Sequence, residues 1–122
     1  MKKLILFGDS IMKGVTFNGS GYHLCPDHDL PQLAARGIEI ENHTKMGATI
    51  GDGLRAMDKY LTSCDSQTTV LLGYGGNDCD YDWQAISDAP SADHSPKTAP
   101  DAYIEGMRRA IRKAQDAGAM VA

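Results

Sequence analysis

A short apolar run that ends in Gly-Asp-Ser constrains the fold of this chain more than any other stretch. Leu4–Phe7 places four apolar residues in a row, which is typical of a strand covered on both faces in a parallel sheet. Gly8 follows this run, and glycine lets the backbone turn sharply without a steric penalty. Open α/β sheets bind their ligands at the carboxyl ends of the strands. Ser10 is therefore predicted to lie at such an edge, where it is a candidate nucleophile.

Three more segments have strand character. Ile38–Asn42 alternates apolar and acidic residues, which predicts a half-exposed strand near a sheet edge. Thr68–Leu72 is β-branched and apolar and gives the clearest strand pattern in the chain. The last residues, 119–122, are interpreted as the first half of a fourth strand.

Helical patterns separate these strands. A short helix is predicted from Asp29 to Gly37, with a proline in its first turn. A second is predicted at about Gly51–Ser63, where Thr49 and Asp52 make a capping box. A third begins near Thr98 and ends at Gly118. Its predicted buried face consists of Ile104, Met107, Ile111 and Ala114.

The connecting segments are expected to lie around the site. Ile11–Val15 is predicted to form a short helical turn beside Ser10. Phe17–Asp27 is rich in glycine and is predicted to be an irregular loop at the rim. Cys79–Ala99 is predicted to be a long polar loop, and loops of that length in small domains commonly serve function.

The resulting order of strands and helices predicts an α/β fold, a three-layer α/β/α flavodoxin-like domain with a doubly wound parallel sheet. Residues 1–122 are read as a single domain that is truncated at the start of its fourth strand, which suggests a fragment of a longer chain. Such an end would expose a sheet edge, so the chain is expected to be marginally stable, to pair with a second copy as a homo-oligomer, or to have been trimmed from a longer protein that folded first.

Composition excludes several classes of function. The formal net charge of −4 argues against a general nucleic-acid binder. No apolar run approaches the ~20 residues of a membrane span, and the apolar run after Lys3 is too short for a signal peptide. The cysteines form no CxxC pair, and the His23–Asp29 cluster matches no metal-ligand geometry, so no metal is expected. A reduced, cytoplasmic protein is the expectation.

Polar residues at three strand ends suggest acyl-transfer chemistry. A serine nucleophile needs fixed donors for the oxyanion that forms when it attacks a carbonyl. The backbone N–H groups of Ser10 and Gly47 and the side-chain amide of Asn77 could supply them. Each residue also has a purely structural interpretation: a helix N-cap for Ser10, a turn glycine for Gly47 and an Asx-turn for Asn77. Asp9 and Asp78 are expected to brace their loops.

These motifs together resemble the N-terminal part of the SGNH hydrolases, the GDSL-type esterases and lipases. The matching residues are Gly8-Asp9-Ser10, Asn42 with Gly47, and Gly75-Gly76-Asn77-Asp78, while Ile11 replaces the usual leucine. The resemblance implies a carboxylic ester hydrolase that acts on a small-molecule ester through an acyl-enzyme. It also implies that Ser10 is the nucleophile, that Gly47 and Asn77 complete the oxyanion hole, and that no cofactor is needed.

The general base of that family is a histidine in a late Asp-x-x-His motif, which this sequence lacks. None of His23, His28, His43 and His94 follows a late strand. The base is therefore expected beyond Ala122, and the chain as given is expected to be essentially inactive. The alternative function is a non-catalytic doubly wound module that binds a phosphorylated small ligand at its strand-end loops and helix N-termini.

Overall fold

A four-stranded parallel sheet forms the centre of the molecule. The computed structural model describes residues 1–25 and 29–122, so Asp27 and His28 of the histidine–aspartate cluster lie outside the described residues. The strands run in the order β4 (Glu39–Asn42), β1 (Lys3–Gly8), β5 (Thr68–Gly73) and β6 (Met120–Val121). All neighbouring pairs are parallel, so every strand ends at the same edge of the sheet. The predicted flavodoxin-like parallel sheet is confirmed, including the last strand.

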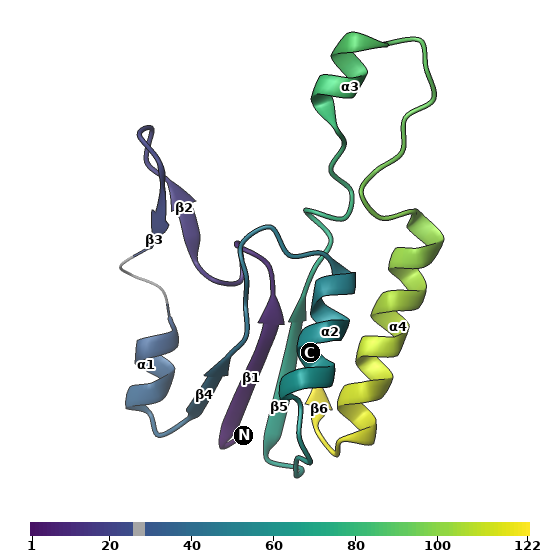
Figure 1. Cartoon of the computed structure of the whole chain (residues 1–122). Helices are drawn as coiled ribbons and strands as arrows, with labels where there is room; N and C mark the ends of the chain where they lie inside the picture. The colour runs from purple at the N-terminus through teal and green to yellow at the C-terminus, as the bar shows by residue number, and fades with distance from the viewer. Residues whose placement is uncertain (26–28) are drawn as a thin grey trace.

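Helices lie on both faces of this sheet. Figure 1 shows α2 (Ile50–Tyr60) and α4 (Pro100–Asp116) side by side over one face. Crossovers between parallel strands are right-handed. Since the connections β1 to β4 and β4 to β5 run in opposite directions across the sheet, α1 (Leu30–Ala35) belongs to the opposite face, beside β4.

The main core lies between the sheet and the α2–α4 pair. Ile5 and Phe7 of β1 and Val70 of β5 point into it, and each is at most 2% exposed. Because side chains alternate along a strand, Leu4 and Leu6 are buried on the other face. This two-sided burial explains why β1 reads as an unbroken apolar run.

The start of α2 follows the predicted capping box. The Thr49 hydroxyl accepts from the backbone N–H of Asp52, and the Asp52 carboxylate accepts from the backbone N–H of Thr49 at 3.0 Å. These bonds satisfy N–H groups that have no partner inside the helix. The capping box therefore fixes where α2 begins.

The prediction of an irregular loop over Phe17–Asp27 was partly wrong. A hydrogen-bonded turn does follow Ser10, but β2 (Val15–Phe17) and β3 (Tyr22–Leu24) then pair as an antiparallel hairpin. The Asn18 side chain closes its turn by accepting from the backbone N–H groups of Ser20 and Gly21. Strands of three residues carry too little alternation to be recognised in sequence.

The segment from Cys79 to Ala99 also differs from the prediction, because it contains the short helix α3 (Trp83–Asp88). The Asp82 carboxylate caps this helix by accepting from the backbone N–H of Ala85 at 3.0 Å. Figure 1 shows that this segment and the β2–β3 hairpin both project from the edge where the strands end. None of the helices in the described part of the chain is long and apolar enough to cross a bilayer.

The buried face of α4 was predicted incorrectly in part. Ile104 is 46% exposed, whereas the buried positions are Gly106, Ala110 and Ala114. The reason is close packing: a Cβ at Gly106 would lie 2.8 Å from Cγ1 of Ile50 in α2. Small residues therefore occupy the contact between the two helices.

Candidate active site

Ser10 is the second residue after β1, and hydrogen bonds hold the backbone on either side of it. The N–H of Asp9 donates to the carbonyl of Gly73 in β5 at 3.0 Å, and the carbonyl of Ser10 accepts from Val15 at 2.9 Å. The buried Asp9 carboxylate accepts from the N–H of Ile11 at 2.9 Å. Asp9 therefore braces the turn, as predicted, and Ser10 is left partly exposed.

The loop after β4 runs alongside the end of β1. The N–H of His43 donates to Leu6, and the N–H of Lys45 donates to the carbonyl of Gly8 at 2.9 Å. Gly47 then adopts a left-handed backbone with φ +72°, which favours glycine. Among the residues that the structure describes, the backbone N–H groups of Ser10 and Gly47 have no hydrogen-bond acceptor.

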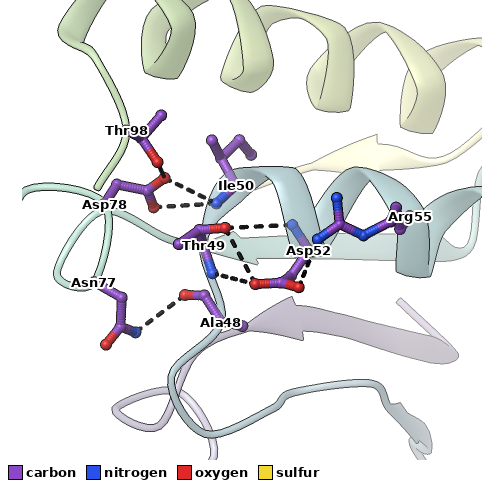
Figure 2. A network of polar contacts seen from close by, with 8 residues as sticks. All are labelled: Ala48, Thr49, Ile50, Asp52, Arg55, Asn77, Asp78 and Thr98. Atoms are coloured by element: carbon purple, nitrogen blue, oxygen red, sulfur yellow. Dashed lines mark hydrogen bonds and ion pairs between the residues drawn. The ribbon is translucent and has the colours of Figure 1, made fainter. Parts of the chain in front are cut away.

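Asn77 in the loop after β5 reaches across to the same region. Its Nδ2 donates to the carbonyl of Ala48, the neighbour of Gly47, at 3.0 Å (Figure 2). Within the described residues, the Asn77 Oδ1 accepts no backbone N–H, so the Asx-turn of the structural interpretation does not form. An amide carries two N–H donors, so one bond orients the group while the second N–H is left for another acceptor.

Asp78 connects three segments that are far apart in sequence. Its carboxylate, only 2% exposed, accepts from the N–H of Ile50 at 3.0 and 3.1 Å and from the Thr98 hydroxyl at 2.6 Å. Figure 2 shows it between the first turn of α2 and the chain that leads into α4. The predicted bracing role of Asp78 is confirmed. Thr98, read only as a helix start, is a partner that the sequence did not reveal.

These bonds tie the loops after β4, β1 and β5 together at one sheet edge. The bond from Asn77 to Ala48 places Asn77 beside the loop that contains Gly47. Ser10 directly follows Asp9, whose N–H donates to Gly73 of β5. An open hollow of about 280 Å³ is lined by Asp9 and Ile11, which flank Ser10 in the sequence, and by Met12, Gly73, Tyr74 and Gly76, but Ser10, Gly47 and Asn77 do not line it. The three candidate residues therefore occupy neighbouring loops, as the strand pattern predicts.

His43 lies close to this edge but is held by other groups. Its ring stacks between Phe7 and Tyr60, with centroids 5.1 and 4.4 Å away, and its Nε2 lies 2.6 Å from Glu41. The Lys3 ammonium and then His43 hold the pKa of the Glu41 carboxyl below its ordinary value. The same pairing, with Glu41 as the larger cause, raises the pKa of Lys3 to about 12.

The other described histidines are also engaged elsewhere. His94 Nε2 lies 2.8 Å from the carbonyl of Ala89, and His23 is in β3 of the hairpin, paired with Thr16. Within residues 1–25 and 29–122, no histidine is hydrogen-bonded to Ser10. In the same ranges, no three His, Cys, Asp or Glu side chains gather closely enough to hold a metal ion.

A comparison with protein-family models and a comparison with curated proteins both found no match. Among solved structures, the chain is similar to the lipase/acylhydrolase from Enterococcus faecalis, with a TM-score of 0.59 and 21% sequence identity. The match covers 99% of this chain and 56% of that protein, so the chain spans about half the length of its structural neighbour. This likeness shows that the α/β fold is shared over nearly the whole chain.

Proposed function

We propose that this chain carries the nucleophile and oxyanion hole of a serine ester hydrolase of the SGNH type. In this proposal Ser10 attacks an ester carbonyl, an acyl-enzyme forms as the alcohol leaves, and water then releases the acid. The observation that carries it is the set of N–H donors on three tied loops. Two are the backbone N–H groups of Ser10 and Gly47, and the third is the second amide N–H of Asn77.

Fixed donors of this kind stabilise the tetrahedral oxyanion without reorganising during the reaction. The Asn77 amide is held through Ala48 and the Ser10 backbone through Val15, so both are oriented before substrate arrives. The space beside Gly47 is open, since no atom other than those of its chain neighbours lies within 4 Å of where its Cβ would be.

A serine hydroxyl also needs a general base, which the described histidines do not supply. His43 is engaged by Glu41 and two aromatic rings, and His94 by a carbonyl. Part of the proposal is therefore that the base is none of His23, His43 and His94 in the arrangement that the structure describes.

The surroundings of Ser10 favour an ester with an apolar acyl or alcohol group. Ile11, its direct neighbour, is 79% exposed, and Met46 in the neighbouring loop is 48% exposed. The β2–β3 hairpin adds three more exposed apolar side chains, those of Phe17, Tyr22 and Leu24. The structural likeness to a lipase/acylhydrolase is consistent with such a substrate.

The alternative function, binding of a phosphorylated ligand, is disfavoured by the N-terminus of α2. A phosphate would bind there through exposed N–H groups. The Asp78 carboxylate already accepts from Ile50, and the Thr49 hydroxyl accepts from Asp52. An anionic protein group thus occupies the position that a phosphate would need.

A serine-reactive phosphonate tests the proposal on the protein as its gene encodes it. Intact mass should show one covalent adduct in the wild type and none in Ser10→Ala. Ser20→Ala is a matched control, because Ser20 is an exposed serine in the hairpin turn and should still allow labelling at Ser10. An adduct that persists in Ser10→Ala, or an unlabelled wild type that binds inorganic phosphate instead, would overturn the proposal.

A further inference from the structure

Asp78 is buried and hydrogen-bonded, yet it faces no candidate reacting atom. Its two oxygens accept from the N–H of Ile50 and from the hydroxyl of Thr98. A carboxylate with so little exposure needs such partners, because burying an unpaired charge is costly. Its position at the first turn of α2 adds a favourable interaction with the helix dipole.

The contacts of Asp78 complement those of its neighbour. Asn77 binds the carbonyl of Ala48, and Asp78 binds the N–H of Ile50, two residues further on (Figure 2). One hydrogen bond alone would allow the β5 loop to pivot about it. Two bonds from adjacent residues to the same short segment remove that freedom and fix the distance between Asn77 and Gly47.

Thr98 connects these two hydrogen bonds to the segment that projects from the sheet edge. Its hydroxyl donates to the Asp78 carboxylate, and its backbone N–H donates to the Asp78 carbonyl at 3.0 Å. The chain that leaves the sheet after Asp78 therefore returns to the same residue before α4 begins. Both ends of the projecting segment therefore meet at Asp78, which also positions the loop of the candidate oxyanion hole.

We infer that Asp78 is a positioning residue, which with Thr98 holds the Asn77 amide and the Gly47 N–H in register for oxyanion binding. This inference rests on the proposed ester hydrolysis. Asp78 acts only through Asn77 and the Gly47 loop, so its loss should lower kcat and leave KM nearly unchanged. It should also matter little once the Asn77 amide has been removed.

The test measures hydrolysis of p-nitrophenyl butyrate by the protein as its gene encodes it. Asn77→Ala should lower kcat about 100-fold, as removing one oxyanion donor does. Asp78→Asn should lower kcat about 10-fold or more with KM changed by less than about threefold, because it places an N–H against the N–H of Ile50. In the Asn77→Ala background, the further loss from Asp78→Asn should be below about threefold, since residues that act as a unit are not additive.

A matched control is Asp80→Asn in the same loop. Asp80 pairs with Lys97 at the exposed base of the projecting segment, at 2.8 Å, and its loss should leave kcat unchanged. Thr98→Val replaces only the hydroxyl with a methyl group. It is the second test variant, to be used if Asp78→Asn does not fold. It should lower kcat about threefold in the wild type and have no further effect in the Asn77→Ala background.

The inference is overturned if folded Asp78→Asn and Thr98→Val keep wild-type kcat, or if their losses multiply in full with that of Asn77→Ala. Failure of the underlying function looks different. In that case Ser10→Ala and Asn77→Ala would themselves leave the hydrolysis rate unchanged.

Discussion

Gly47, in the loop beside the end of β1, has a backbone conformation that favours glycine. Its φ of +72° lies in the left-handed region, where a side chain costs about 1–2 kcal/mol. No atom lies within 4 Å of an added Cβ, so the cost is conformational and not a clash. We expect Gly47→Ala to lower the free energy of unfolding by about 1 kcal/mol. It should also lower kcat for ester hydrolysis, because relief of the strain turns the N–H away.

Gly19 in the hairpin turn provides the control for this prediction. Its φ is +91°, and an added Cβ there also meets no atom within 4 Å. Gly19→Ala should therefore cost a similar free energy of unfolding, measured by urea denaturation, with no change in kcat. Equal kcat values for the two variants would contradict the role of the Gly47 N–H.

Asp52 makes the start of α2 sensitive to pH. The backbone N–H of Thr49, followed by smaller effects of Arg55 and the Thr49 hydroxyl, lowers the pKa of this carboxyl. Since the folded pKa is the lower one, the stabilisation is present above the unfolded pKa of about 3.9. It is lost as the pH falls through the folded pKa.

Asp52→Ala should therefore lower the free energy of unfolding by about 1 kcal/mol at pH 7. The difference from the wild type should shrink as the pH falls below the unfolded pKa of about 3.9. Urea denaturation at a series of pH values measures both quantities. A difference that stays constant down to acid pH would show that the ionised capping box contributes nothing.

At the scale of elements, the β2–β3 hairpin presents one apolar face. Val15 pairs with Leu24 and Phe17 with Tyr22, so all four side chains lie on one side, while Thr16 and His23 lie on the other. The rings of Phe17 and Tyr22 are 5.3 Å apart and largely exposed. A two-stranded hairpin in water gains stability when such a face is covered.

Under the proposed function, the apolar part of the substrate contacts this face. The double variant Phe17→Ser with Tyr22→Ser should lower kcat/KM for a p-nitrophenyl octanoate and spare the acetate. Each methylene that loses its contact is worth about fourfold. His23→Ser, on the opposite face, is the control. Equal losses for both esters would show that the hairpin does not select for chain length.

At the scale of the whole molecule, the contact between α2 and α4 decides how tightly the helical layer covers the sheet. A Cβ at Gly106 would meet Ile50, the first residue of α2, at 2.8 Å. Gly106→Ala should therefore lower the free energy of unfolding by about 1–2 kcal/mol, because overpacking outweighs the better helix propensity of alanine.

Gly51→Ala is the matched control for this contact. The atoms nearest to an added Cβ at Gly51 lie at 3.7 and 3.8 Å, which is ordinary contact. That variant should unfold at the same or a slightly higher urea concentration than the wild type. A Gly106→Ala protein at least as stable as the wild type would mean that the two helices can separate without cost.

Much of the fold could be predicted from the sequence because its signals are local. The apolar run of β1, the Thr49–Asp52 capping box and the strand before Gly73 each depend on a few adjacent residues. The parallel arrangement then follows, and with it the placement of Ser10, Gly47 and Asn77 at one edge. The short hairpin strands and the exposure of Ile104 did not follow, because three residues carry no clear period and helix packing selected small residues.

Local patterns along the chain predict the strands and helices, their order and the polar groups available at the strand ends. The partners that those groups take depend on how the folded chain packs. Asn77 binds Ala48 across 29 residues, and Asp78 binds Ile50 and Thr98 across 28 and 20 residues. His43 is likewise held by Phe7 and Tyr60. The physical reason is that periodicity and capping act between neighbours in the chain, whereas a buried polar group takes whichever partner the packed fold brings within hydrogen-bond distance.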